Sequence, residues 1–181
     1  MTAFTMTLDL SALGLDELVA GAEEAVRPAA QAGAQVYYDR VKANVAKIGR
    51  VSGNLAGSIY QVYSRDNSGK GVAQYHVSWN RRKAPHGHLV EYGHVQRYVT
   101  YIDKRGQWRT LVRPEMVGKP KPKRNAPQAM KDAYYVPLKG GPRVVGARSF
   151  VRAAKVPAVD RAARNAMIDT YWYTLERKGL L

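Results

Sequence analysis

Residues 50–62, RVSGNLAGSIYQV, join two segments of opposite character. The alanine-rich chain before them has the pattern of a helix that runs to Ile48, and Gly49 can take the left-handed conformation that ends a helix. After them, residues 58–64 (SIYQVYS) have the branched and aromatic content of a β-strand. The Ser, Gly and Asn at 52–54 favour a tight corner. The stretch therefore predicts a hinge from helix to strand.

The segment before this hinge has helical periodicity. Pro28 interrupts it, which allows either a kink within one helix or a second helix with Pro28 in its first turn. Steps of three and four residues separate its apolar positions from Leu15 to Val36, as in an amphipathic helix, and three later positions continue the stripe. These positions are Leu15, Leu18, Ala22, Ala25, Ala29, Ala32, Val36, Val41, Val45 and Ile48.

Several later segments have strand or helix patterns. Residues 72–79 alternate, with Ala73, Tyr75, Val77 and Trp79 on one face, and predict a half-buried strand that pairs with 58–64 through a DNSGKG loop. Residues 95–102 and 107–113 predict a second hairpin around 103–106, with Gly106 in the turn. Residues 134–138 predict a short edge strand. From Pro157, helical spacing up to Gly179 predicts a C-terminal helix.

This order of elements predicts an α+β fold. We expect an N-terminal helix or kinked helix pair, an antiparallel sheet of about four to five strands, and a C-terminal helix packed on the sheet. The length of 181 residues favours a single domain over 1–181. Residues 104–128 would extend from it as a basic hairpin and arm, because GKPKPKRNAP at 118–127 combines three prolines with four basic residues and favours an exposed, semi-extended chain.

The net charge of +15 is concentrated in the second half of the chain. Residues 1–40 contain two basic and six acidic residues, whereas residues 81–160 contain eighteen basic and five acidic residues. Such a field favours contact with nucleic acid, a membrane surface or acidic protein subunits. The chain has no cysteine, no apolar run of about 20 residues and no basic, signal-like start, so we expect a protein of the cytosol.

Candidate catalytic and metal-binding patterns are weak. His86, His88 and His94 around Glu91 could ligate a metal, but their spacing matches no known ligand geometry, and surface or hydrogen-bonding histidines are the favoured interpretation. There is no GxSxG elbow, no thiol, no phosphate-binding glycine loop and no carboxylate cluster for two metals. The sequence predicts a protein that is not an enzyme, with no catalytic residue, cofactor or metal.

Nucleic-acid binding is a stronger hypothesis than catalysis. Basic residues alternate with aromatic ones, which together provide phosphate contacts and stacking surfaces. The same aromatic spacing also suits a sheet core, and no helix-turn-helix, zinc finger or RNP-like motif occurs. A free nucleic-acid-binding protein with a basic sheet surface is therefore the alternative hypothesis. The aromatic residues in question are Tyr98, Tyr101, Trp108, Tyr134 and Tyr135.

Three segments together resemble the neck and tail-completion proteins of long-tailed bacteriophages, also called minor tail or head-to-tail joining proteins. The segments are VSGNLAGSI at 51–59, HLVEYGH at 88–94 and ARSFVRAA at 147–154, and the resemblance spans about residues 15–175. The sequence departs from the family pattern at four positions. Ser52 replaces the usual Thr, His94 replaces a Thr after Gly93, and Ser149 and Ala153 stand where prolines are usual around Phe150.

The resemblance implies a structural virion protein. It would assemble as an oligomeric ring, sixfold or twelvefold, at the head-tail junction, and would lie in the neck or tail of the virion and in the host cytoplasm during assembly. Its partners would be copies of itself, the phage connector or adaptor, the tail-tube or tail-terminator proteins and, without sequence preference, packaged DNA. No membrane would be involved.

The resemblance also assigns roles to particular residues. Gly53, Asn54 and Leu55 would set the angle of the hinge. Glu91 and Gly93 would hold a turn against the sheet, and Phe150 would anchor the core under the last helix. In the basic arm, the residues expected to contact neighbouring subunits or DNA are Arg105, Arg109, Lys119, Lys121, Lys123 and Arg124.

Overall fold

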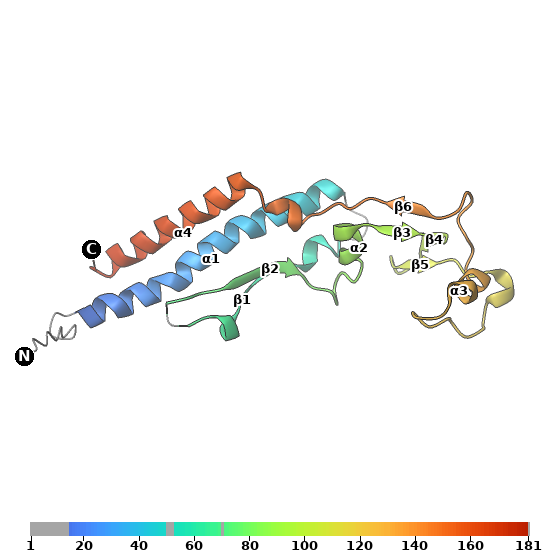
Figure 1. Cartoon of the computed structure of the whole chain (residues 1–181), viewed down its shortest axis with the longest axis horizontal. Coiled ribbons are helices and arrows are strands. Elements are labelled where there is room, and N and C mark those ends of the chain that lie inside the picture. Colours follow the sequence, from blue (N-terminus) through green and yellow to red (C-terminus); the bar gives the residue numbers. More distant parts are fainter. Residues whose placement is uncertain (1–14, 50–52, 70, 181) are drawn as a thin grey trace, which may run out of the picture. The chain divides into compact units, whose positions relative to one another are not determined.

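A computed structural model describes residues 15–49, 53–69 and 71–180 (Figure 1). They form two compact units. Unit 1 consists of the described residues up to Pro85 and from Phe150 onward, and unit 2 is His86–Ser149. Unit 2 is therefore inserted between two parts of the chain that fold together. Ser52, the first residue of the expected corner, lies outside the described residues.

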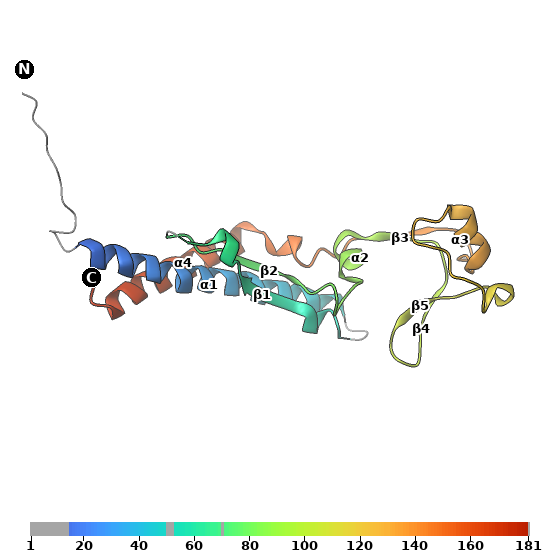
Figure 2. The same cartoon turned by 90° about the horizontal axis from the view of Figure 1, so that it is seen from below.

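Two long helices lie side by side in unit 1, with opposite chain directions (Figures 1 and 2). Helix α1, Leu15–Ile48, is a single helix of 34 residues with Pro28 inside it, so the alternative of two separate helices is wrong. The predicted stop is confirmed, because Gly49 follows with φ of 93°. The predicted C-terminal helix is also confirmed as α4, Pro157–Arg177, and it packs along α1.

The buried face of α1 contains small residues that bring the two helices close together. Gly21, Ala25, Ala29 and Gly33 follow one another at steps of four, and the two alanines are buried. A Cβ added to Gly33 would lie 2.5 Å from Met167 Cγ, so no side chain fits there without movement. Leu18, which belonged to the predicted stripe, is 42% exposed. The buried face of α1 therefore differs from the predicted apolar stripe. It includes Gly21 and Gly33, which are buried at the seam between the helices although glycine is not a hydrophobic residue.

A β-hairpin packs on α1 within the same unit. Strand β1, Ile59–Tyr63, follows a short 3-10 helix, η2 (Ala56–Ser58), and pairs antiparallel with β2, Tyr75–Trp79. A second 3-10 turn, η3 (Arg65–Asn67), lies in the connection. The predicted alternation of β2 is confirmed at Tyr75 and Val77, which are half-buried, and at His76 between them, which is exposed. Helix α1 therefore has α4 along one side and the hairpin along another.

Every hydrophobic side chain that is buried in the described part of the chain belongs to unit 1. Phe150 is fully buried, and its ring meets that of Trp79 edge to face at 5.4 Å. The amide nitrogen of the Asn44 side chain on α1 donates a 2.9 Å hydrogen bond to the carbonyl of Phe150. The short helix η5, Arg152–Ala154, then packs on α1. The buried residues are Ala25, Ala29, Val41, Val45, Ile59, Ala84, Phe150, Ala154, Ala163 and Leu175.

Unit 2 is built from short elements. Its two antiparallel ladders pair β3 with β6 and β4 with β5, and each strand has three residues. Helix α2 lies where the sequence predicts a turn at Glu91 and Gly93, and α3 begins at the end of the predicted arm and ends at Tyr134, the first residue of the predicted edge strand. The elements are α2 (Gly87–Tyr92), β3 (His94–Gln96), β4 (Thr100–Ile102), β5 (Trp108–Thr110), η4 (Pro114–Met116), α3 (Gln128–Tyr134) and β6 (Arg143–Val145).

The predicted α+β class is confirmed, but the sheet differs from the prediction. In place of one sheet of four to five strands, the described strands form three separate two-stranded ladders, one in unit 1 and two in unit 2. The expected edge strand at 134–138 begins as the end of α3 and continues through isolated bridges at Tyr135 and Pro137. The strands are divided because unit 2 folds from an inserted segment with its own pairing.

Candidate interaction surface

The hairpin β4–β5 of unit 2 has a turn organised by one carboxylate. Asp103 accepts hydrogen bonds from the backbone N–H of Arg105 at 2.9 Å and of Gln107 at 2.8 Å, and from Arg109 Nε at 2.9 Å. Gly106 closes the turn with φ of 72°, as its predicted position in the turn requires. The backbone N–H of Gln107, followed by Arg109, holds the pKa of the Asp103 carboxyl below its ordinary value. The Asp103 carboxylate is therefore hydrogen-bonded by groups of the hairpin itself, and these bonds hold the turn.

Both faces of this hairpin are open to solvent. Ile102 pairs with Trp108 across the strands, and Tyr101 pairs with Arg109, so one face is apolar and the other is aromatic and basic. Trp108 is 55% exposed, Tyr101 48% and Ile102 45%. A two-stranded hairpin is at best marginally stable in water. Large apolar groups on such a hairpin therefore favour contact with another surface.

A tyrosine cluster ties the neighbouring chain segments of unit 2 together. The Tyr98 hydroxyl donates a 2.7 Å hydrogen bond to Asp132 Oδ1, and Gln128 donates to both groups at 2.7 Å. The hydrogen bonds from Tyr98 and then Gln128 lower the pKa of Asp132. Burial, followed by the hydrogen bond to Asp132, raises the pKa of Tyr98. The Tyr135 ring packs between those of Tyr98, at 5.1 Å, and Tyr134, at 4.9 Å.

The loop at 118–127 is exposed but attached to α3. The Tyr134 hydroxyl donates to the carbonyl of Lys119 at 3.1 Å, and Lys131 Nζ donates to the carbonyl of Arg124 at 2.7 Å. Just before the loop, Arg113 Nε donates to the carbonyls of Asp132 and Tyr135, both at 3.2 Å. The basic segment thus has a defined path along α3, and its charged side chains remain in solvent.

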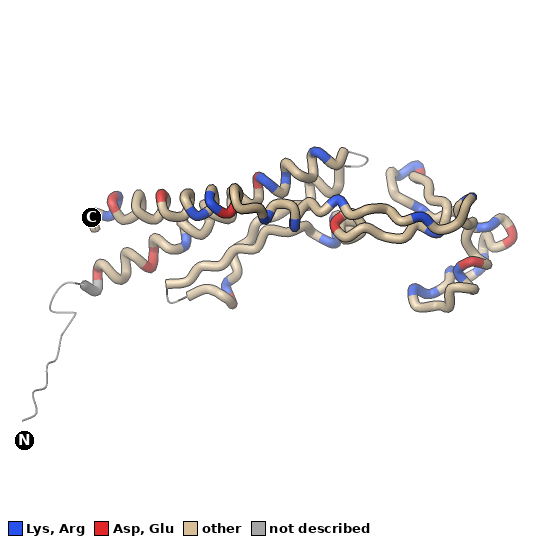
Figure 3. The backbone as a smooth tube through the Cα atoms, turned by 45° about the horizontal axis from the view of Figure 1, so that its top comes forward, with Lys and Arg blue, Asp and Glu red and all other residues tan. Residues whose placement is uncertain are grey.

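All six basic residues singled out in the sequence are exposed. Arg109 forms an ion pair with Asp103, whereas the other five have no ion-pair partner in the described part of the chain. Unit 2 as a whole contains thirteen Lys and Arg against four Asp and Glu, a net charge of +9. Figure 3 shows these basic positions distributed over the trace of the unit. The six residues singled out in the sequence are Arg105, Arg109, Lys119, Lys121, Lys123 and Arg124.

Unit 2 buries no hydrophobic side chain, although it contains many. The only residues of His86–Ser149 that are buried are Gly87 and Glu91. A segment of this size that is stable by itself buries apolar side chains in a core. The large hydrophobic residues that it exposes are Tyr92, Val95, Tyr101, Ile102, Trp108, Leu111, Val117, Met130 and Val144. The sequence gives no sign of this property, because alternating strand positions predict one buried face.

The hinge residues lie just before η2. Gly53 has φ of 75° and its carbonyl accepts a hydrogen bond from the N–H of Gly57. The carbonyl of Leu55 accepts from both the N–H and the hydroxyl of Ser58, at 3.0 and 2.7 Å. Asn54 between them is exposed. These bonds turn the chain directly into β1.

The second and third sequence motifs meet in unit 2. Gly93 has φ of 75°, and a Cβ there would lie 2.7 Å from the carbonyl oxygen of Val145. On the same path, the N–H of Arg148 donates to the carbonyl of Val90 at 2.8 Å, and the Ser149 hydroxyl donates to the carbonyl of Glu91 at 3.1 Å. Glu91 is 1% exposed. The motif HLVEYGH therefore forms α2 and its exit, held against the chain at 145–149.

The histidines of this motif do not form a metal-binding cluster in the structure. No group of three or more His, Asp or Glu side chains with suitable positions occurs among the described residues. Burial, followed by the charge of His88, lowers the pKa of His86. His94 Nδ1 is buried without a hydrogen-bond partner. In the segments that the structure covers, no helix is long and apolar enough to span a membrane.

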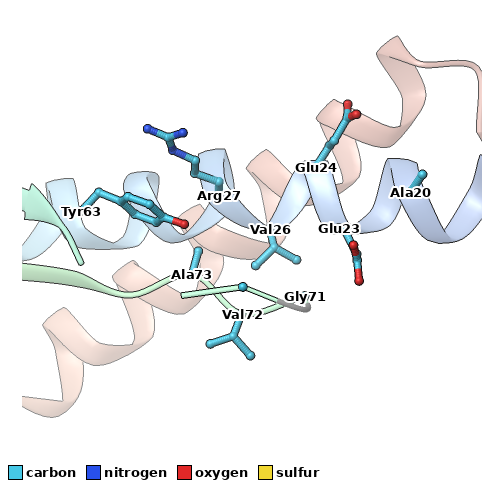
Figure 4. A pocket seen from close by; sticks show the side chains of 10 residues that line it. Ala20, Glu23, Glu24, Val26, Arg27, Tyr63, Gly71, Val72 and Ala73 are labelled. Carbon is cyan, nitrogen blue, oxygen red and sulfur yellow. The ribbon is translucent and has the colours of Figure 1, made fainter. Parts of the chain in front are cut away.

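Unit 1 has an open groove of about 440 Å³ between α1 and the loop of the β1–β2 hairpin (Figure 4). Residues 20–27 of α1 line one side, and Tyr63 and Val72 lie on the other. The Arg27 guanidinium stacks over the Tyr63 ring at 4.5 Å. In Figure 4 the Glu23 side chain points to the side of Val72, whereas Glu24 and Arg27 point the opposite way. The groove is thus lined by both apolar and charged side chains, with Val26 and Val72 beside Glu23, Glu24 and Arg27.

Residues 13–93 match a family described as "Bacteriophage HK97-gp10, putative tail-component". The matched range contains the described part of α1, the hairpin β1–β2 and α2, and it includes the motif at 51–59 and most of that at 88–94. Over this range the chain is similar to a phage tail component, in agreement with the resemblance drawn from the first two motifs. The third motif, at 147–154, lies outside the matched range. No curated protein and no solved structure matches the chain.

Proposed function

We propose, from the tail-component pattern of residues 13–93, that this chain is a non-catalytic structural protein of a long-tailed phage that acts at the neck or head-tail junction. The observation that carries the proposal is the contrast between the two units. Unit 1 contains every buried hydrophobic side chain of the described chain, whereas unit 2 exposes its large apolar and basic side chains together. A protein that works by contact with other subunits needs such a surface.

Assembly into a ring follows from this mode of action. Copies that bind through two different patches form a closed ring when the rotation between them closes, and sixfold or twelvefold closure would match the symmetry of a tail or a connector. The chain would then lie between the connector or adaptor on one side and the tail-tube or tail-terminator proteins on the other. It would act as a tail-completion or head-tail joining protein in the virion.

The charge of unit 2 supports contact with anionic neighbours. Five of the six basic residues from the sequence analysis are exposed without an ion-pair partner in the described chain, so their charges are available. Long-range attraction by such groups speeds association and orients partners. The anionic surfaces at a head-tail junction would be acidic faces of neighbouring proteins and the phosphates of DNA that passes through the ring.

A free nucleic-acid-binding protein is the second candidate. The exposure of Tyr101 across from Arg109 on one face of the hairpin favours it, because aromatic and guanidinium groups together bind single strands by stacking and charge. Such a protein would act as a monomer or dimer, and its binding would weaken steeply with salt.

Mass measurement of the purified chain together with negative-stain imaging of virions tests the proposal. We expect defined oligomers, and we expect the chain at the junction of head and tail in particles. A chain that remains monomeric at all concentrations, is absent from particles and binds one nucleic-acid sequence selectively would favour the second candidate.

A further inference from the structure

We propose that the β4–β5 hairpin of one copy docks against the start of α1 and the adjoining groove in unit 1 of a second copy. This inference rests on the proposed function and specifies the contact between subunits. The contact joins two different patches of the same chain, so each copy offers one of each. Because the hairpin belongs to unit 2 and the groove to unit 1, the contact depends only on the structure of each unit by itself.

The hairpin supplies an apolar pair beside a basic turn. Ile102 and Trp108 lie opposite each other and are about half exposed, and they share one face. Lys104 and Arg105 at the tip are exposed and have no acidic partner in the described chain, because Asp103 is engaged by the turn itself and by Arg109. The tip is therefore cationic although it contains an aspartate.

The start of α1 supplies the opposite charge. Residues 15–26 contain four acidic residues and no basic one, in a chain with a net charge of +15. Glu24 forms an ion pair with Lys178, whereas Glu17 and Glu23 are exposed and have no ion-pair partner among the described residues. Two carboxylates at this end of the helix are thus available for the two cations of the hairpin tip.

The groove supplies the apolar part of the contact. Its volume of about 440 Å³ lies in the range of pockets that hold a drug-sized molecule, and two large side chains such as Ile102 and Trp108 are of that order. Val72 at its edge is 59% exposed, and Val26 lines its helix side. Glu23 points to the Val72 side and Arg27 away from it (Figure 4). The apolar Val72 and the free Glu23 carboxylate therefore lie on the same side of the groove.

A second copy fits this surface better than nucleic acid does. The carboxylates of Glu17 and Glu23 would repel phosphates but attract Lys104 and Arg105. Since the hairpin and the groove are different surfaces, the contact is heterologous and continues from copy to copy. Burial of Ile102 and Trp108 would also cover apolar area that the isolated chain leaves in water.

Charge reversal tests the contact in the full-length chain. We expect Lys104→Glu/Arg105→Glu and, separately, Glu17→Lys/Glu23→Lys to raise the concentration needed for self-association by at least about tenfold. An equimolar mixture of the two variants should associate, because each restores a complementary pair with the other. Lys139→Glu, at an exposed residue of unit 2 that is not part of the hairpin, is the control and should leave self-association unchanged.

Disulfide cross-linking tests which residues of the two copies lie close together. Because the chain has no native cysteine, only the introduced cysteines can react. Under oxidation, Arg105→Cys mixed with Glu23→Cys should form a disulfide-linked pair that contains one copy of each variant. Arg105→Cys mixed with Ala46→Cys, an exposed position farther along α1, should not. Each variant is first shown to have the parental melting temperature.

The outcomes separate this contact from the proposed function. Defined oligomers that tolerate both charge reversals and show no selective cross-link would overturn the contact but leave the ring intact. Hairpin reversal that abolishes retention of duplex DNA in a mobility shift, with self-association unchanged, would overturn it in favour of nucleic acid. A strictly monomeric chain that is absent from particles would overturn both.

Discussion

The backbone of Gly93 passes so close to Val145 that no side chain fits between them. A Cβ at Gly93 would lie 2.7 Å from the Val145 carbonyl oxygen and 2.8 Å from the backbone nitrogen of Ala147, and φ of 75° is unfavourable for other residues. The glycine of HLVEYGH is thus required by the approach of the chain that leads into ARSFVRAA. Two sequence motifs more than 50 residues apart meet at one backbone contact.

Replacing this glycine should destabilise unit 2. Gly93→Ala combines a strained backbone with a collision against main-chain atoms that cannot move aside, and we expect a loss of about 2 kcal/mol or more in the free energy of unfolding. Urea denaturation followed by amide hydrogen exchange in 86–149 measures it. Gly146→Ala is the control, since a Cβ there meets nothing within 4 Å. Equal stability of both variants would contradict the packing of β6 against Gly93.

Phe150 should contribute strongly to the stability of unit 1. Its side chain is fully buried against Trp79, so Phe150→Ala should cost about 3 to 5 kcal/mol through lost burial and the cavity that remains. Thermal unfolding monitored by tryptophan fluorescence and circular dichroism reports the change. Val144→Ala, at a position 81% exposed, should stay within about 0.5 kcal/mol of the parent. A mild effect of Phe150→Ala would place the core elsewhere.

The close approach of α1 and α4 can be tested at Gly33. Gly33→Leu inserts a side chain where a Cβ alone would lie 2.5 Å from Met167 Cγ and 2.7 Å from its sulfur, and we expect a cost of about 1 to 3 kcal/mol. Met167→Ala in the same chain should recover part of that cost by making room. A double-mutant cycle in urea measures the coupling. Additive effects of the two substitutions would show that α1 and α4 are not in contact at Gly33 and Met167.

The turn of the β4–β5 hairpin should depend on the ionisation of Asp103. The hydrogen bonds from the N–H of Gln107 and from Arg109 lower the carboxyl pKa in the folded state. The stabilisation is therefore present above the ordinary pKa of about 3.9 and is lost as the pH falls through the lowered value. Titration of the Asp103 carboxyl by NMR should give a midpoint below the ordinary one. Arg109→Ala should raise that midpoint only in part, because the backbone donors remain; an ordinary midpoint in the parent would refute this turn.

The basic loop at 118–127 should serve assembly and contribute little to folding. Lys119, Lys121 and Lys123 are exposed and have no ion-pair partner in the part of the chain that the structure describes. Replacing all three by Gln should change the free energy of unfolding by less than about 0.5 kcal/mol. In phage complementation, the same variant should yield fewer joined heads and tails. Full infectivity would remove the role proposed for these lysines.

Local patterns in the sequence determined the elements that depend on neighbouring residues. The helix that ends at Gly49, the alternation in β2, the turn at 103–106 and the C-terminal helix that ends before Gly179 are all predictable, because periodicity and glycine conformation act over a few residues. The motifs at 51–59 and 88–94 indicate the likeness to a phage tail component by themselves, since they are runs of neighbouring residues. The exposure of the basic residues follows from their charge.

Tertiary structure decided which surfaces meet. The seam at Gly21 and Gly33, the contact of Gly93 with the chain at 145–147, and the cluster of Tyr98, Gln128 and Asp132 join residues that are far apart in sequence. The division into two units, and the fact that only one of them has a hydrophobic core, depends on the same long-range packing. A periodic pattern states that one face of an element is apolar, but burial depends on whether another part of the chain covers that face. In unit 2 the described chain covers the apolar side chains only in part, and many of the large ones remain exposed.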